Sequence, residues 1–233
     1  KNIIKSNYNY KTLDMEVLHD GAFDNGPPLT IDTKISKRKL YFSNLQKMNN
    51  FDCIVGYFGH LYPGRGIEII EKLSNIHMKS LFLVFGGQDE EILRYKNSNK
   101  ASNLIFMGHL NYRDVNNTMS LMDVLLMPYQ KSVSVSLKSV DTASWMSPIK
   151  MFEYMSVGLP IISSDLPVLK EILIDRNNCL LVKPDDINDW SIALSKLIDD
   201  KNLAYNLGQS AYNIFRNNYT WENRARKMIN FLD

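Results

Sequence analysis

Two loop-and-helix segments carry the residues best suited to binding an anion. The first is Gly59-His-Leu-Tyr-Pro-Gly-Arg-Gly66, which follows an apolar run and precedes a helical pattern. Glycines let backbone approach a ligand, a helix N-terminus offers free N–H groups to an anion, and the guanidinium of Arg65 suits phosphate. The segment has neither the Gly-x-Gly-x-x-Gly of a nicotinamide dinucleotide site nor the Lys-Ser or Lys-Thr ending of a Walker loop. It predicts a phosphate contact; the alternative is a glycine turn with a surface arginine.

The second segment is Ser147-Pro-Ile-Lys-Met-Phe-Glu-Tyr-Met-Ser-Val-Gly-Leu-Pro160. Pro148 suits the first turn of a helix and Gly158 suits its end. Lys150 and Glu153 interrupt the apolar face of this helix three residues apart. Free N–H groups at the helix start could meet a diphosphate, and a carboxylate one turn further on could accept hydrogen bonds from ribose hydroxyls. Alternatively, Lys150 and Glu153 form a surface pair worth a few tenths of a kcal/mol.

A third segment, Phe106-Met-Gly-His-Leu110, ends a strand pattern in a glycine turn. A flat base could lie against its exposed backbone, although the segment also fits an ordinary turn. His60 and His109 could each carry a proton, but a lone histidine near a turn is more often packed or exposed.

The elements that would position these segments alternate along the chain. Short runs rich in Ile, Val, Leu and Phe predict strands covered on both faces, at 53–58, 80–85, 103–107, 124–127, 160–163 and 179–182. Helical patterns are expected at 66–75, 89–97, 111–121, 149–157, 166–174, 187–199, 201–217 and 220–232. This alternation predicts an α/β fold: a Rossmann-like, doubly wound parallel sheet of about six strands with helices on both faces. Ligands of such sheets bind at the carboxyl ends of the strands, where all three segments fall.

Residues 1–50 differ from the rest of the chain. They are polar and rich in Asn and Lys, with one apolar strand pattern at 15–18 and a helical piece near 34–48. We expect an irregular N-terminal segment there.

Composition excludes several classes of protein. Of the 233 residues, 45% are hydrophobic and 22% are charged, which is the balance of an ordinary globular protein. No apolar run approaches the ~20 residues of a membrane helix. A net charge of +2 argues against nucleic-acid binding. No Cys/His cluster has zinc spacing, and no Asp-x-Asp pair could hold a metal diphosphate. Cys53 and Cys179 lie in apolar stretches and predict buried free thiols, hence a reducing, cytoplasmic compartment.

Basic residues cluster at 34–39 and 224–227. They fit solvated faces, or peripheral contact with anionic lipid headgroups or a lipid-diphosphate acceptor at the inner face of a membrane. Both interpretations stay open.

Taken in order, these blocks resemble the C-terminal domain of the group 1 family of retaining glycosyltransferases, which have the two-domain GT-B architecture. The similarity runs from about residue 16 to 232. Val17–Asp24 resembles the start of that domain, Gly59–Gly66 its Gly-Arg-Leu-x-x-x-Lys-Gly loop, and Phe82–Gly87 its strand ending in paired glycines. Phe152–Asp165 resembles the most specific block, and Tyr219–Glu222 the start of the final helix.

The resemblance implies roles for individual residues. Arg65 matches a cation that neutralises the leaving diphosphate, and Glu153 matches the second glutamate of a Glu-x7-Glu motif, which holds the donor ribose. The resemblance, with Lys150 added, predicts Arg65, Lys150 and Glu153 as catalytic residues. The predicted donor-binding residues are Gly59, His60, Gly64, Arg65, Gly66, Gly87, Met107, Gly108, His109, Leu110, Tyr129, Ser147, Pro148, Ile149, Lys150 and Glu153.

Two positions depart from the family pattern. The first glutamate of the motif falls at Trp145, and the arginine of the glycine loop is His60 here. The contact with the transferred sugar is therefore missing or rebuilt, with Lys150 or Tyr129 as candidates to compensate.

By this resemblance the expected reaction transfers a sugar from a nucleoside-diphosphate sugar to an acceptor hydroxyl with retention, for polysaccharide or glycoconjugate synthesis, and without a metal or other cofactor. Residues 51–218 would be the donor-binding domain, 1–50 an irregular and inter-domain linker region, and 219–233 a helix crossing to an N-terminal acceptor domain. That domain is absent from these residues, and Lys1 in place of Met indicates an excised piece, which we expect to be inactive alone. Two alternatives remain: a sugar-nucleotide epimerase, which Trp145 disfavours, and a non-catalytic nucleotide-binding or assembly module.

Overall fold

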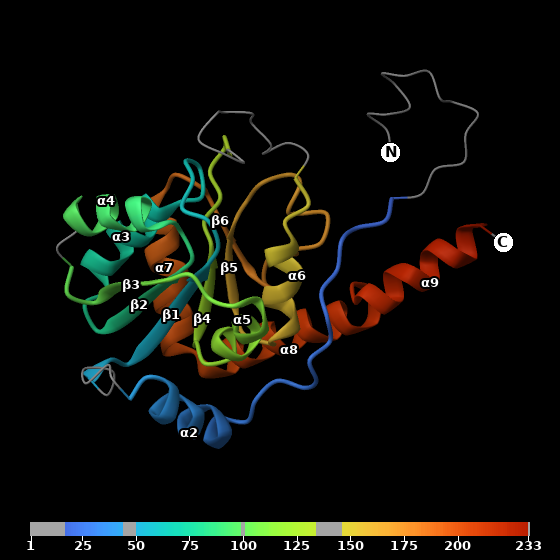
Figure 1. Ribbon diagram of the computed structural model, residues 1–233, viewed down its shortest axis with the longest axis horizontal. Coiled ribbons are helices and arrows are strands. Elements are labelled where there is room, and N and C mark those ends of the chain that lie inside the picture. The colour runs from blue at the N-terminus through green and yellow to red at the C-terminus, as the bar shows by residue number, and fades with distance from the viewer. Residues whose placement is uncertain (1–16, 44–49, 99–100, 134–145, 233) are drawn as a thin grey trace.

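A computed structural model of the chain describes residues 17–43, 50–98, 101–133 and 146–232. In this part of the chain one six-stranded sheet has the order β3-β2-β1-β4-β5-β6, and every neighbouring pair is parallel (Figure 1). The strands are β1 Cys53–Phe58, β2 Ser80–Phe85, β3 Leu104–Gly108, β4 Val124–Met127, β5 Ile161–Ser164 and β6 Leu180–Val182. The predicted doubly wound fold is confirmed, and three of the strands begin and end at the predicted residues.

The helices of the described ranges are α2 Ile31–Tyr41, α3 Ile67–Ile76, α4 Asp89–Ser98, α5 Tyr112–Met119, α6 Ile149–Ser156, α7 Ile187–Asp199, α8 Lys201–Asn218 and α9 Trp221–Leu232. α9 projects away from the sheet (Figure 1). None of the helices in these ranges is long and apolar enough to cross a bilayer.

Helices cover both faces of the sheet because each central strand is apolar on both sides. Along β1, Val55 and Tyr57 join one core with α3, α4 and α7, whereas Ile54 and Phe58 join another with α5, α6 and α8. The two cores bury Trp190 on one face and Phe152 on the other. Cys53 and Cys179 are buried free thiols, as predicted.

The connection between β5 and β6 corrects one prediction. The helix expected at 166–174 is a run of turns, with backbone hydrogen bonds that mix two spacings. The buried Asn178 side chain accepts a hydrogen bond from the Ile174 N–H at 2.7 Å and donates to the Ile172 carbonyl at 2.9 Å. These bonds replace the ones that would continue a helix, which is how an asparagine competes with helical structure.

The N-terminal segment also differs from expectation. Residues 17 and 18 form no strand, and the rest of the predicted 15–18 strand lies outside the described residues. The helix expected near 34–48 is α2, which begins at Ile31 because Thr30 caps it by accepting from the Thr33 N–H at 3.3 Å. Residues 44–48 of that prediction lie outside the described part.

A partly buried carboxylate joins α2 to the sheet. The Asp123 side chain pairs with Lys34 at 2.9 Å and Arg38 at 2.7 Å, and it accepts from the Ile54 N–H at 2.9 Å. Burial acts to raise the pKa of the Asp123 carboxyl, but Lys34 and Arg38 outweigh it and hold the pKa below its ordinary value. Since α2 has no buried residue of its own, this cluster is its main attachment. Two cations of the 34–39 cluster therefore act within the fold.

Replacing this carboxylate tests the attachment. We expect Asp123→Asn to lower the free energy of unfolding by about 2 kcal/mol, because two largely desolvated cations lose their partner. The effect should disappear in acid, since a group with a lowered folded pKa stabilises only above that pKa. Urea denaturation at neutral and acid pH measures both. Asp52→Asn, at an exposed position before β1, is the control; equal stability of the two variants would contradict the assignment.

Candidate functional site

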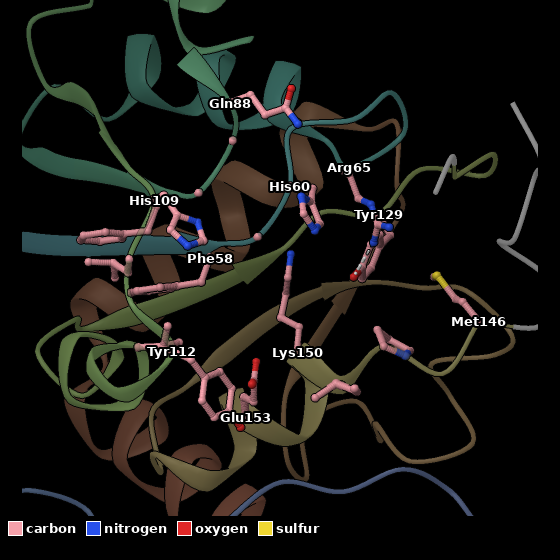
Figure 2. A pocket seen from close by; sticks show the side chains of 18 of the residues that line it. Phe58, His60, Arg65, Gln88, His109, Tyr112, Tyr129, Met146, Lys150 and Glu153 are labelled. Carbon is pink, nitrogen blue, oxygen red and sulfur yellow. Dashed lines mark hydrogen bonds between the residues drawn. The ribbon is translucent and has the colours of Figure 1, made fainter. Parts of the chain in front are cut away.

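A cavity of about 910 Å³ opens at the carboxyl ends of β1 and β4, where the strand order reverses direction (Figure 2). This is the position at which open parallel sheets bind ligands. The volume is within the range of small-molecule sites. Its lining residues are Phe58, Gly59, His60, Arg65, Phe85, Gly86, Gly87, Gln88, His109, Leu110, Tyr112, Val115, Tyr129, Met146, Ser147, Pro148, Ile149, Lys150 and Glu153.

The glycine loop after β1 is fixed by close backbone packing. Gly66 begins α3 with φ 80°, and a Cβ there would lie 1.9 Å from the Pro128 carbonyl oxygen. A Cβ on Gly64 would lie 2.0 Å from the Ser132 carbonyl oxygen, and the Gly64 carbonyl accepts from the Gln130 N–H at 2.9 Å. No side chain larger than hydrogen fits at either position without a shift. These two glycines therefore hold the loop against the chain that follows β4.

Arg65 lies between those glycines and faces the cavity. Its Nη1 donates to the Tyr129 hydroxyl at 2.9 Å, and its guanidinium carbon lies 5.1 Å from the Tyr129 ring centroid. Its Nε is buried without a hydrogen-bond partner among the described residues. A buried N–H donor left in this way costs free energy until an acceptor arrives.

Lys150 approaches the same space from α6 (Figure 2). Its ammonium lies 4.0 Å from the Tyr57 ring centroid and 5.3 Å from the Tyr129 ring centroid. Within the described residues, neither Arg65 nor Lys150 forms an ion pair within 4.0 Å. The surface pair of Lys150 with Glu153 therefore does not form in this structure. The two cations are held by aromatic rings.

Tyr154 attaches α6 to β1. Its buried hydroxyl accepts a hydrogen bond from the Phe58 N–H at 2.8 Å. Pro148 precedes the helix without a side-chain cap, and within the described ranges the first N–H groups of α6 are free to bind an anion. Glu153, one turn on, is half-buried at the cavity wall.

The pKa shifts follow from this desolvated pair of cations. Burial, and then Arg65, hold the pKa of the Lys150 ammonium well below its ordinary value, although Glu153 opposes the shift. Burial raises the pKa of the Glu153 carboxyl, and Lys150 offsets part of that change. Burial, followed by Arg65 and Lys150, lowers the pKa of His60, whose ring stacks on Tyr62 with centroids 4.8 Å apart. The site is therefore electropositive and suited to an anion.

Most of the predicted site residues meet at this cavity, and Arg65 and Glu153 both line it. Four do not line it: Gly64, Gly66, Met107 and Gly108. The first two pack the loop. Met107 packs against a core, and the Gly108 carbonyl accepts from the Gly86 N–H at 2.6 Å. Trp145 lies outside the described residues.

Sequence reasoning missed seven lining residues: Phe58, Phe85, Gly86, Gln88, Tyr112, Val115 and Met146. Phe58 and Phe85 end adjacent strands, and their rings stack with centroids 4.5 Å apart. Both phenylalanines are the last residues of predicted strands, so the strand ends together with the pairing of β1 and β2 could have identified them as lining residues.

Among the described residues no group of three His, Cys, Asp or Glu side chains could hold an ion. That the reaction needs no metal stays a prediction.

Comparison with known proteins shows the family of this chain. The family model described as glycosyl transferases group 1 matches residues 52–200. An uncharacterised glycosyltransferase of Methanocaldococcus jannaschii is 23% identical over 235 residues, covering 97% of this chain and 54% of that protein. Among solved structures, sucrose-phosphate synthase of Thermosynechococcus elongatus has a TM-score of 0.76 at 18% identity, covering 99% of this chain and 55% of the other.

A second solved structure was determined with a ligand. Anabaena HepE in complex with UDP-glucose has a TM-score of 0.74 at 18% identity, covering 93% of this chain and 57% of that chain. These structural similarities establish the fold, half of a GT-B architecture. The chain spans about half the length of these proteins.

Removing the Lys150 charge should stabilise the ligand-free chain. We expect Lys150→Met to raise Tm by about 2–4 °C, which corresponds to roughly 1 kcal/mol in a chain of this size. Because the pKa of Lys150 is lowered in the folded state, the unfolded chain binds more protons than the folded chain. The destabilisation caused by Lys150 is therefore complete below its folded-state pKa and vanishes above the ordinary lysine pKa. Scanning calorimetry at neutral and strongly alkaline pH measures this. Lys72→Met, at an exposed position on α3, is the matched control, and a lower Tm for Lys150→Met would refute the prediction.

Proposed function

Because this chain belongs to the group 1 glycosyl transferases, we propose that it binds the nucleoside-diphosphate sugar of an enzyme that transfers the sugar to an acceptor hydroxyl with retention. The observation that carries the proposal is that Arg65, Lys150, Glu153 and the start of α6 line one cavity. The similar fold of a protein crystallised with UDP-glucose supports it. The biosynthetic role is the assembly of a polysaccharide or another glycoconjugate.

The diphosphate lies between Arg65 and the N-terminus of α6. The unpartnered Nε of Arg65, the Lys150 ammonium and the free N–H groups of Ile149 and Lys150 supply donors from two directions. When the bond to the sugar breaks, negative charge grows on the departing diphosphate. Fixed positive groups in a poorly solvated site stabilise that charge without reorganising. They do so here without a metal ion.

Glu153 accepts hydrogen bonds from the ribose hydroxyls. It lies one turn beyond the phosphate-binding end of α6, which is about the separation between a diphosphate and its ribose. The base lies beyond, against His109 and Leu110. The stacked rings of Phe58 and Phe85 form an apolar wall there.

The acceptor binds to a second, N-terminal domain of the whole protein. The proposal rests on length, since the related proteins have about as much chain again. Residues 51–218 form the donor domain, and α9 crosses to the acceptor domain. This chain alone therefore binds donor weakly and turns over little or none.

Two substitutions test the donor site. We expect Arg65→Ala and Glu153→Ala each to weaken nucleotide binding by about 1–3 kcal/mol, the cost of losing a charged hydrogen bond. Isothermal titration with UDP, GDP, ADP, CDP and dTDP measures the loss and identifies the base.

The controls for these variants are Arg94→Ala and Glu171→Ala, at exposed positions outside the cavity lining. If no nucleotide binds to the parent chain, the donor-binding proposal fails. Equal affinity in the parent, Arg65→Ala and Glu153→Ala would instead favour a non-catalytic module that kept the fold.

The pKa of Lys150 predicts proton uptake on binding. A diphosphate favours the charged ammonium, so it raises a pKa that is lowered in the free chain. Affinity for a sugar nucleotide should therefore fall as the pH rises through the free-state pKa of Lys150. Titration calorimetry with UDP-glucose or GDP-mannose, in buffers of different ionisation enthalpy, measures the protons taken up. Lys150→Met should abolish this alkaline uptake; an unchanged uptake would exclude Lys150 as its source.

A further inference from the structure

The ammonium of Lys150 lies between two tyrosine rings and the glycine loop. The Tyr57 ring centroid lies 4.0 Å from the nitrogen, and the Tyr129 ring is 5.3 Å away. The nitrogen also lies close against Gly59, since a Cβ built on that residue would be 2.6 Å from it. Tyr57, Tyr129 and Gly59 therefore restrict where the ammonium can lie.

Tyr57 is itself fixed at both ends. It is the fifth residue of β1 and only 1% exposed, and its ring packs in the core formed with α3, α4 and α7. Its hydroxyl donates to the His60 carbonyl at 2.7 Å, which ties it to the glycine loop. Tyr57 is not among the residues that line the cavity. It can affect a ligand only through Lys150 or the loop.

We propose that Tyr57 is a positioning residue that directs the Lys150 ammonium at the donor diphosphate through a cation–π contact. The inference rests on the proposed function and deepens it. An aromatic face attracts a cation electrostatically, and the attraction is stronger where water is excluded. Unlike a carboxylate, the ring carries no net charge, so the cation keeps its full charge for the diphosphate.

The alternative is that Tyr57 only fills the core. Both roles predict a loss of stability when the ring is removed. They differ in what happens to ligands, because a positioning residue acts on the diphosphate and leaves the nucleoside unaffected. The comparison of a nucleoside diphosphate with its own nucleoside is therefore the decisive measurement.

The experiment compares Tyr57→Leu, which removes the ring, with Tyr57→Phe, which keeps it. The ligands are UDP and uridine, or the pair whose base the parent chain prefers. We expect Tyr57→Leu to weaken diphosphate binding about tenfold and to change nucleoside binding less than about twofold. Tyr57→Phe should restore most of the diphosphate affinity. In a Lys150→Met background, Tyr57→Leu should have no further effect on the diphosphate.

Tyr95→Leu is the matched control because Tyr95 is a buried tyrosine in the same core. It should lower stability and leave the ratio of the two affinities unchanged. If Tyr57→Leu does not fold, a series of increasingly fluorinated phenylalanines at position 57 replaces it. Fluorine withdraws charge from the ring face at nearly constant size, so each added fluorine should weaken diphosphate binding.

Three outcomes would overturn the inference: equal losses for diphosphate and nucleoside, an effect that persists in the Lys150→Met background, or an affinity that does not change along the fluorinated series. These outcomes differ from those expected if the proposed function itself is wrong. If the chain is not a donor-binding domain, the parent chain binds no nucleotide, or Lys150→Met binds nucleotide as well as the parent does.

Discussion

The candidate site depends on two cations, Arg65 and Lys150, that are brought together without forming an ion pair within 4.0 Å among the described residues. Arg65 and Lys150 repel one another, and both lose solvent at the same cavity. The rings of Tyr57 and Tyr129 attract the cations without neutralising them. The ligand-free site is therefore less stable than an apolar one would be, and an anion relieves that cost. A binding site that holds unpaired cations for an anionic ligand is expected to lower the stability of the ligand-free protein.

Such a site needs separate and rigid attachments for each cation. The loop that carries Arg65 is packed through glycines whose neighbours leave no room for a side chain. The helix that carries Lys150 and Glu153 is joined to β1 through Tyr154. Neither attachment uses a group that would contact the proposed ligand. Site residues supported in this way keep their geometry whether or not the ligand is present.

At the amino ends of the central strands, opposite the cavity, the same residue types have another role. Lys34 and Arg38 are also brought together, but there a carboxylate, Asp123, lies between them. That cluster holds α2 to the sheet and leaves little charge for a ligand. Direct ion pairing with a carboxylate thus separates the structural use of two cations at Asp123 from the proposed binding use at the cavity, where Glu153 forms no such pair. Sequence clustering of basic residues alone could not distinguish these uses.

The sequence by itself determined the fold and most of the candidate site, because both depend on local patterns. Apolar runs define the strands, and loops at the ends of parallel strands must meet at one edge of the sheet. Tertiary structure decided the rest. The segment 166–174 forms turns whose last residues bond to the buried Asn178 side chain, and the glycine at position 64 packs the loop without lining the cavity. Tyr57 looks like any core residue in sequence, and only the approach of Lys150 across the sheet edge gives its ring a cation to hold. Contacts between distant segments depend on packing, which a local pattern does not contain.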